Sequence, residues 1–158
     1  MKKLKSKLSV LFLFGSIIST SSVAALPEFI KAQKATSSFG SALILNVSEF
    51  EALSGQVLVA LFETKSGYEA DQTVRSKVVP VNKESITIKF ERLPVGEYAY
   101  KLFHDVNGDG KLNTDVLGIP KEPYYFSQDA SDPFSAPEWE EAKFLLPAGT
   151  MKQSVEIN

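Results

Sequence analysis

Short stretches of alternating apolar and polar residues dominate the chain after residue 40. The clearest is residues 85–90, where Ile86, Ile88 and Phe90 fall on one face and polar residues on the other. A period of two residues indicates a strand with one face in a core. Residues 55–62 are apolar at nearly every position, which is typical of a central strand covered on both faces.

Turn residues separate these stretches. In residues 93–96, Pro94 fixes its φ angle and Gly96 tolerates a positive one. An apolar period of 3.6 residues, the mark of an amphipathic helix, is not sustained over three turns anywhere after the N-terminal region. The sequence therefore predicts an all-β fold, a single antiparallel β-sandwich of about seven strands, of the immunoglobulin-like kind, with a long loop insert. The expected strands are residues 42–47, 55–62, 74–81, 85–90, 97–104, 142–146 and 151–157.

The insert spans residues 105–141 and shows no clear strand pattern. Loops of this length are usually functional or disordered, and the aromatic content argues against disorder. Two interpretations stay open. The aromatic side chains pack the insert onto the rim of the sandwich, or Tyr124, Tyr125 and Trp139 form a platform that stacks against a glycan or a peptide.

The first 24 residues have the features of a secretory signal peptide. Four lysines precede an apolar core, residues 8–18, which is short for a membrane span, and small residues follow. We therefore expect a signal peptide at 1–24, a flexible lead-in at 25–40 and the sandwich domain at 41–158. The mature protein would be exported, either periplasmic or secreted.

Charge and cysteine content exclude several functional classes. Removing residues 1–24 takes four of the 17 basic side chains and none of the 19 acidic ones, so the formal charge falls from −2 to −6. An acidic domain is a poor candidate for nucleic acid, and we expect no membrane insertion after signal cleavage. The chain has no cysteine, which excludes disulfides and thiolate zinc sites. We expect a monomer whose partner is an extracytoplasmic protein or glycan.

A calcium-loop pattern follows the strand at 97–104. Oxygen-bearing side chains alternate and a glycine follows, as in the first half of an EF-hand loop. The twelfth position, which requires glutamate in that loop, is Val116. Calcium is therefore expected to take its remaining ligands from Asp115, Glu122 or the acidic residues of 129–141. The predicted ligands are Asp105, Asn107, Asp109, the Lys111 carbonyl, and Asn113 or Asp115. Without an ion, Asp105 and Asn107 would cap tight turns.

His104 is the only histidine and ends the inward face of its strand. Such a histidine is usually a hydrogen-bonded structural residue. A hydrolase centred on His104 and Glu122 is the alternative. The chain has no Gly-x-Ser-x-Gly nucleophile elbow and no glycine-rich phosphate loop, so we expect a protein that is not an enzyme.

Several segments of the chain carry a family resemblance: residues 55–62, 93–99, 104–112, 118–122, 126–127 and 134–144, among them His-Asp-x-Asn-Gly-x-Gly-Lys-Leu and Gly-Ile-Pro-Lys-Glu. Together they resemble an exported bacterial family, domain of unknown function 2141, over about residues 42–157. The resemblance implies a small secreted β-sandwich, similar to prealbumin-like and carboxypeptidase-regulatory-like domains, with no established activity. Asp109 stands where the family often has asparagine, and Asn113 where it often has an acid.

Overall fold

The computed structural model describes residues 40–132 and 135–157. The expected signal peptide, and the expected lead-in up to residue 39, lie outside these residues. The all-β prediction is confirmed, because the described chain holds eight strands and only short helices. The strands are β1 (Ser41–Ser48), β2 (Gln56–Phe62), β3 (Arg75–Pro80), β4 (Ser85–Leu93), β5 (Gly96–Asp105), β6 (Tyr124–Phe126), β7 (Phe144–Leu146) and β8 (Thr150–Glu156).

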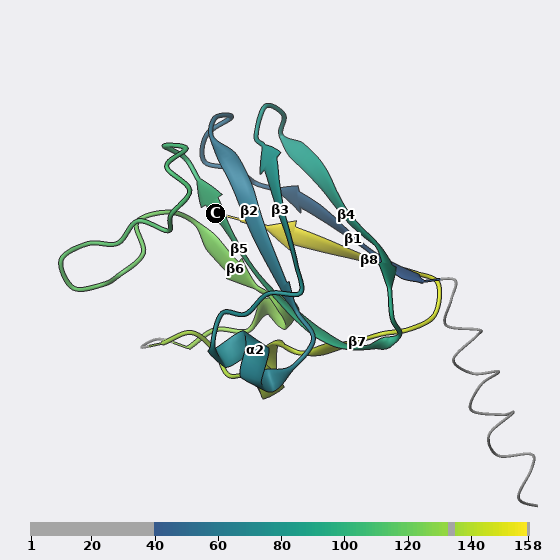
Figure 1. The fold of residues 1–158 in the computed structure, drawn as a ribbon. Helices are drawn as coiled ribbons and strands as arrows, with labels where there is room; N and C mark the ends of the chain where they lie inside the picture. The colour runs from purple at the N-terminus through teal and green to yellow at the C-terminus, as the bar shows by residue number, and fades with distance from the viewer. Residues whose placement is uncertain (1–39, 133–134, 158) are drawn as a thin grey trace, which may run out of the picture. The chain divides into compact units, whose positions relative to one another are not determined.

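The strands form two sheets (Figure 1). One sheet has the order β4-β1-β8, and the other has the order β3-β2-β5-β6, with β7 paired to a separate part of β5. The pairs are antiparallel except that of β1 and β8, which is parallel. This pair departs from the purely antiparallel prediction, because β7 pairs with β5 in one sheet whereas β8 lies beside β1 in the other.

The core between the sheets is built from the alternating positions of the sequence. On β4, Ile86, Ile88 and Phe90 are buried as predicted, and on β5 the inward face carries Tyr98 and Tyr100. Most of the buried aliphatic side chains of β1 and β2 belong to the same cluster. Burial of such side chains contributes about 1.5–3 kcal/mol each, so this core holds the two sheets together.

A second, smaller cluster covers the outer face of β5 and β2. It contains Phe62, Tyr68, Ala99, Trp139 and Ala142. Helix α2 (Lys65–Glu69) supplies the tyrosine and helix α3 (Trp139–Ala142) the tryptophan, whose rings meet edge to face with centroids 5.9 Å apart. Neither helix was predicted, because each is too short to show a helical period.

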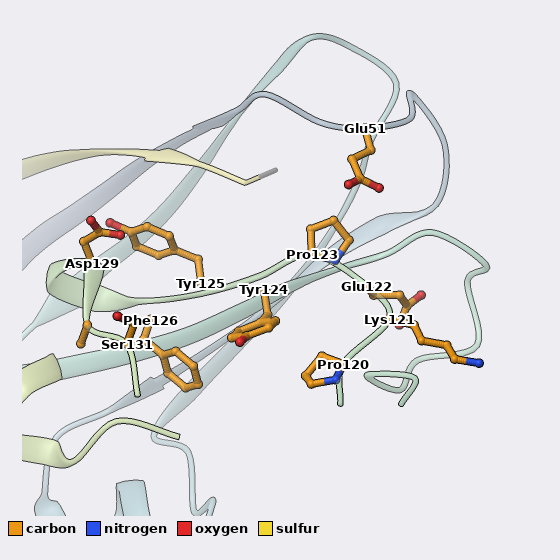
Figure 2. Close-up of a pocket in the computed structure, with 11 residues that line it drawn as sticks. Glu51, Pro120, Lys121, Glu122, Pro123, Tyr124, Tyr125, Phe126, Asp129 and Ser131 are labelled. Carbon is orange, nitrogen blue, oxygen red and sulfur yellow. The ribbon is translucent and has the colours of Figure 1, made fainter. Parts of the chain in front are cut away.

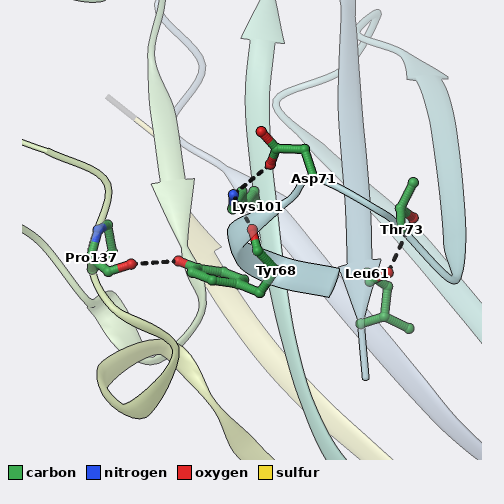
Figure 3. Close-up of polar contacts among 6 residues, drawn as sticks. All are labelled: Leu61, Tyr68, Asp71, Thr73, Lys101 and Pro137. Atoms are coloured by element: carbon green, nitrogen blue, oxygen red, sulfur yellow. Dashed lines mark hydrogen bonds and ion pairs between the residues drawn. The ribbon is translucent and has the colours of Figure 1, made fainter. Parts of the chain in front are cut away.

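Polar contacts fasten the second cluster to the sheet (Figure 3). The Tyr68 hydroxyl donates to the Pro137 carbonyl over 3.0 Å, and burial raises the pKa of Tyr68 to about 12. The Lys101 ammonium donates to the Tyr68 carbonyl at 2.9 Å and pairs with Asp71 at 2.6 Å. It also lies 4.3 Å from the centre of the Tyr68 ring, a cation–π contact.

The insert is more regular than its sequence indicates. It contains β6, the 3₁₀ helix η1 (Ser127–Asp129) and α3. The buried Ser127 hydroxyl accepts a hydrogen bond from the Tyr100 amide at 3.0 Å and donates to the Ala142 carbonyl at 2.6 Å. The insert is thereby bonded to the sheet rather than left as a free loop. In the described part of the chain no helix is long and apolar enough to cross a membrane.

Candidate functional site

Asp105 ends β5 and organises the loop that follows. Its side chain is buried, and each carboxylate oxygen accepts two hydrogen bonds. A carboxylate has about four lone-pair positions, and these N–H donors use all four, so Asp105 holds a tight turn by itself. Oδ1 accepts from the amides of Gly108 (2.8 Å) and Asp109 (3.1 Å), and Oδ2 accepts from the Gly110 amide and the Gln56 side chain (2.8 Å each).

These donors also set the acidity of Asp105. Burial alone would raise the pKa of its carboxyl, but the hydrogen bonds from Gln56 and the loop amides outweigh that effect and lower it. The pKa of Asp109 is lowered as well, chiefly by the hydrogen bond from the Asn113 side chain and then by that from the Lys111 amide. Both carboxylates are therefore stabilised in the charged form by the folded loop.

The start of β2 supports the end of β5. Gly55 has a φ of 70°, and a Cβ atom there would lie 2.1 Å from the Asp105 carbonyl oxygen, so only glycine fits. His104 Nε2 lies 2.8 Å from the Ser54 carbonyl. Because a carbonyl only accepts, Nε2 carries the proton. The ring is fully buried and packs edge to face on Phe50, which matches the structural role expected for His104.

Glu122 closes the loop from its far end. The side chain is buried, Oε1 accepts from the Val106 amide at 3.0 Å, and Oε2 accepts from the Asn113 amide at 2.9 Å. The sequence predicts that an acid must return to the loop because Val116 stands where a calcium loop has glutamate. Glu122 does return, but it binds amide groups. The acidic residues 129–141 are not part of this closure.

The remaining predicted metal ligands fall into two groups. Asp109, Asn107 and Asn113 converge, and the amide nitrogens of both asparagines point at Asp109 Oδ2, at 3.3 and 3.0 Å. The Lys111 amide donates to Asp109 Oδ1 at 2.9 Å. Asp115 instead turns toward the next bend and accepts from other amides. Within residues 40–132 and 135–157, no three histidine or acidic side chains gather as a metal-binding group.

Strand β6 borders a second candidate site (Figure 2). It ends the sheet order, so among the described strands none pairs with its outer edge. A hollow of about 430 Å³ lies beside it. Figure 2 shows Glu51 and Lys121 on one side of the labelled set and Asp129 on the other. The lining combines residues 120–126 with Glu51 and residues 129–131.

The three aromatic residues predicted to form a platform lie in different places. Trp139 is only 4% exposed and belongs to the second cluster. Tyr125 faces the sandwich core and stacks on Tyr100, with ring centroids 6.3 Å apart. Tyr124 is 46% exposed and meets Phe126 edge to face on the other side of β6. Only Tyr124 and the rim of Tyr125 are available to a ligand, because neighbouring residues of a strand point to opposite faces.

Sequence reasoning missed the residues that come from elsewhere in the chain. Gln56 is a polar residue at the head of an apolar run, and its register opposite Asp105 depends on the pairing of β2 with β5. Glu51 and Asp129 both line the hollow beside β6, although Glu51 precedes β2 and Asp129 ends η1. The polar Gln56 at the start of the apolar run 55–62 was the only signal available in the sequence, because strand pairing is not visible in a single sequence.

Comparison with known proteins places the chain in a family. The family model described as "Uncharacterized protein conserved in bacteria (DUF2141)" matches residues 45–154. The chain belongs to this family. The match runs from within β1 to within β8 and includes the Asp105 loop and β6, which confirms the family resemblance seen in the sequence. No curated protein and no solved structure matches the chain.

Proposed function

We propose that this member of the family is an exported, non-enzymatic binding module that captures an extended basic peptide along β6. The observation that carries the proposal is an unpaired strand edge beside an acid-lined hollow. A peptide that adds a strand to a sheet edge gains affinity from main-chain hydrogen bonds and specificity from the side chains nearby.

The register between β6 and β5 defines which backbone groups of β6 are available to an added strand. The His104 amide donates to the Pro123 carbonyl at 2.8 Å, so Pro123 points toward β5. Backbone groups alternate in direction along a strand. Tyr124 and Phe126 therefore turn their N–H and C=O groups away from β5, toward the outer edge. Those four groups are the docking points for an added strand.

The charge of the hollow favours a basic peptide. Glu51 and Asp129 are exposed at its rim, and Lys121 is the one basic residue of its lining in the described chain. Glu122 also lines the hollow, but its oxygens are bonded to loop amides. The exposed ring of Tyr124 lies between the two free acids along the chain and suits the aliphatic part of a lysine or arginine side chain.

The hydrolase alternative has less support. His104 is fully buried, its Nε2 is engaged by Ser54, and its Nδ1 has no hydrogen-bond partner among the described residues. A general base must come within hydrogen-bond reach of a substrate. A histidine enclosed by Phe50 and the β2 start does not offer that reach.

A weak calcium site at the loop is a second candidate function. The convergence of Asn107, Asp109 and Asn113 favours it, because rotation of the two amides would present oxygen instead of nitrogen to a cation. The saturated carboxylate of Asp105 limits the affinity. Calcium would therefore add to a loop that its own hydrogen bonds already hold together.

The peptide proposal is tested by fluorescence anisotropy with a labelled Lys-Val-Lys-Val-Lys peptide. We expect saturable binding that is lost when glutamate replaces the lysines. Tyr124→Pro removes an outward N–H that β5 does not use, and should weaken binding about fivefold, the free energy of about one hydrogen bond. Tyr124→Ala keeps that N–H and separates the backbone contribution from the side chain.

Charge variants supply the matched control. Glu51→Lys should weaken binding about two- to fivefold, as expected for one exposed ion pair. Glu91→Lys makes the same charge change on β4, in the other sheet, and should leave affinity unchanged. Equal binding of the lysine and glutamate peptides, or equal effects of the two charge variants, would contradict the proposal.

A further inference from the structure

The connection between β5 and β6 ends in an apolar tip. Residues 113–121 form a small hairpin, in which Thr114 and Pro120 are bridged and the Lys121 amide donates to the Asn113 carbonyl at 2.8 Å. Figure 1 shows this connection, in green, extending away from the two sheets. Its foremost side chains are apolar: Val116 is 100% exposed, Leu117 80% and Ile119 58%. An apolar cluster this exposed usually marks an interaction surface.

Several backbone amides of the tip are hydrogen-bonded within the hairpin. Asp115 Oδ1 accepts from the amides of Leu117 (2.8 Å) and Ile119 (2.9 Å). The Asp115 carbonyl accepts from Gly118 at 3.1 Å, and the Asp115 amide donates to Ile119 at 2.8 Å. Pro120 has no N–H. These internal bonds lower the cost of moving the tip out of water, because fewer backbone donors lose their hydrogen bonds to water.

Charge indicates what kind of surface this tip meets. Lys111 and Lys121 are exposed, and in the sequence they stand at the two ends of the hairpin. Long basic side chains can hold their charge among lipid phosphates while an apolar neighbour goes deeper. The domain as a whole is acidic, which disfavours a surface with net negative charge. The predicted export signal would also bring the protein to a membrane.

We propose that Val116, Leu117 and Ile119 insert into the interfacial layer of an electrically neutral phospholipid bilayer, with Lys111 and Lys121 at the level of the phosphates. The contact is peripheral and reversible. The sequence predicts no membrane insertion after signal cleavage. The proposal differs from that expectation because the side chains of a loop tip enter the bilayer, although no segment spans it. Affinity comes from the apolar side chains, so it should change little with ionic strength.

Sedimentation with sucrose-loaded phosphatidylcholine vesicles tests the proposal, using the exported protein without residues 1–24. The triple variant Val116→Ser, Leu117→Ser, Ile119→Ser should lower the partition coefficient about tenfold or more. The matched control changes three exposed apolar residues elsewhere, Leu53→Ser, Val78→Ser and Leu145→Ser. This control should stay within about twofold of wild type.

A second measurement reports insertion directly. Leu117→Trp should be quenched by brominated phosphatidylcholine. The native Trp139 is buried in the second cluster and serves as the unquenched reference in the wild-type protein. The proposal is overturned if the wild type does not sediment with neutral vesicles, if both triple variants lose equal affinity, or if the Leu117→Trp fluorescence is unquenched. Binding that requires anionic lipid and disappears at high salt would also overturn it.

Discussion

The two halves of the insert are built in opposite ways. In residues 105–123, the buried carboxylates of Asp105 and Glu122 bind amide groups on the inside, and apolar side chains stand on the outside. In residues 127–142, Trp139 and Ala142 are buried on the inside, and acidic residues face water. We refer to them as the polar lobe and the aromatic lobe.

The contrast separates structure from function within one insert. Apolar burial is the ordinary way to fix a loop, and the aromatic lobe uses it to cover β5. The polar lobe fixes its backbone with carboxylates instead, and Val116 and Leu117 stay exposed. A loop that does not need its apolar residues for stability can present them to a partner. The lobes should therefore respond differently to mutation, pH and cations.

The largest effect is expected in the aromatic lobe. Trp139→Ala should lower the free energy of unfolding by about 3–5 kcal/mol, because it leaves a cavity against Tyr68 and Phe62. Urea denaturation followed by circular dichroism measures this change. Leu145→Ala, at an exposed position of β7, is the control and should change stability by less than about 0.5 kcal/mol. Similar values for the two variants would show that Trp139 does not anchor the lobe.

The polar lobe should be broken most by Asp105→Asn. The new amide keeps one acceptor oxygen but turns an N–H group toward donors that Oδ2 now binds. We expect a loss of about 2–3 kcal/mol, the range for leaving buried donors unpaired. Asp115→Asn is the matched control, because Asp115 accepts both of its amide bonds through one oxygen, which asparagine retains. Its effect should be under about 1 kcal/mol.

Lowering the pH should also distinguish the polar lobe from the aromatic lobe. The pKa values of Asp105 and Asp109 are lowered in the folded state, so their contribution to stability is complete above the unfolded pKa of about 4 and is lost as the pH falls through the folded values. The urea midpoint of the wild type should drop over this range. Asp105→Asn should show a shallower drop, whereas Trp139→Ala should keep the wild-type slope at lower overall stability. If the urea midpoint of Asp105→Asn fell with pH as steeply as that of the wild type, Asp105 would not be a source of this pH dependence.

How far the sequence predicted this molecule depends on the range of the interactions. Alternation and apolar runs placed the described strands other than β6, and also the inward faces of β4 and β5, because these patterns are local properties. It did not place β8 parallel to β1 or reveal α2, since sheet order and short helices follow from tertiary packing. Trp139 shows the same limit. Its partner Tyr68 lies far away in sequence, so an exposed platform and a buried anchor could not be told apart.

The candidate site, too, was predicted only where its pattern is local in the sequence. The spacing of Asp105, Asn107 and Asp109 predicted a calcium loop or, without an ion, a tight turn, and Val116 indicated that calcium would need an acid from elsewhere in the insert. That Glu122 returns to bind the Val106 and Asn113 amides follows from the hairpin at 113–121. Whether these groups also hold calcium stays a prediction, and it is the smallest effect expected.

Calcium should therefore stabilise the polar lobe only slightly. For a dissociation constant of about 1 mM, about 10 mM calcium adds roughly 1.4 kcal/mol to the free energy of unfolding. Differential scanning calorimetry in calcium and in EGTA measures the shift. Asp109→Asn should abolish it, because Asp109 is the one carboxylate of the converging group, while Asp115→Asn should leave it intact. Magnesium should increase the free energy of unfolding less than calcium does, because it gives up its bound water reluctantly. A shift that survives Asp109→Asn would place the ion elsewhere, and no shift at all would mean that hydrogen bonds alone hold this loop.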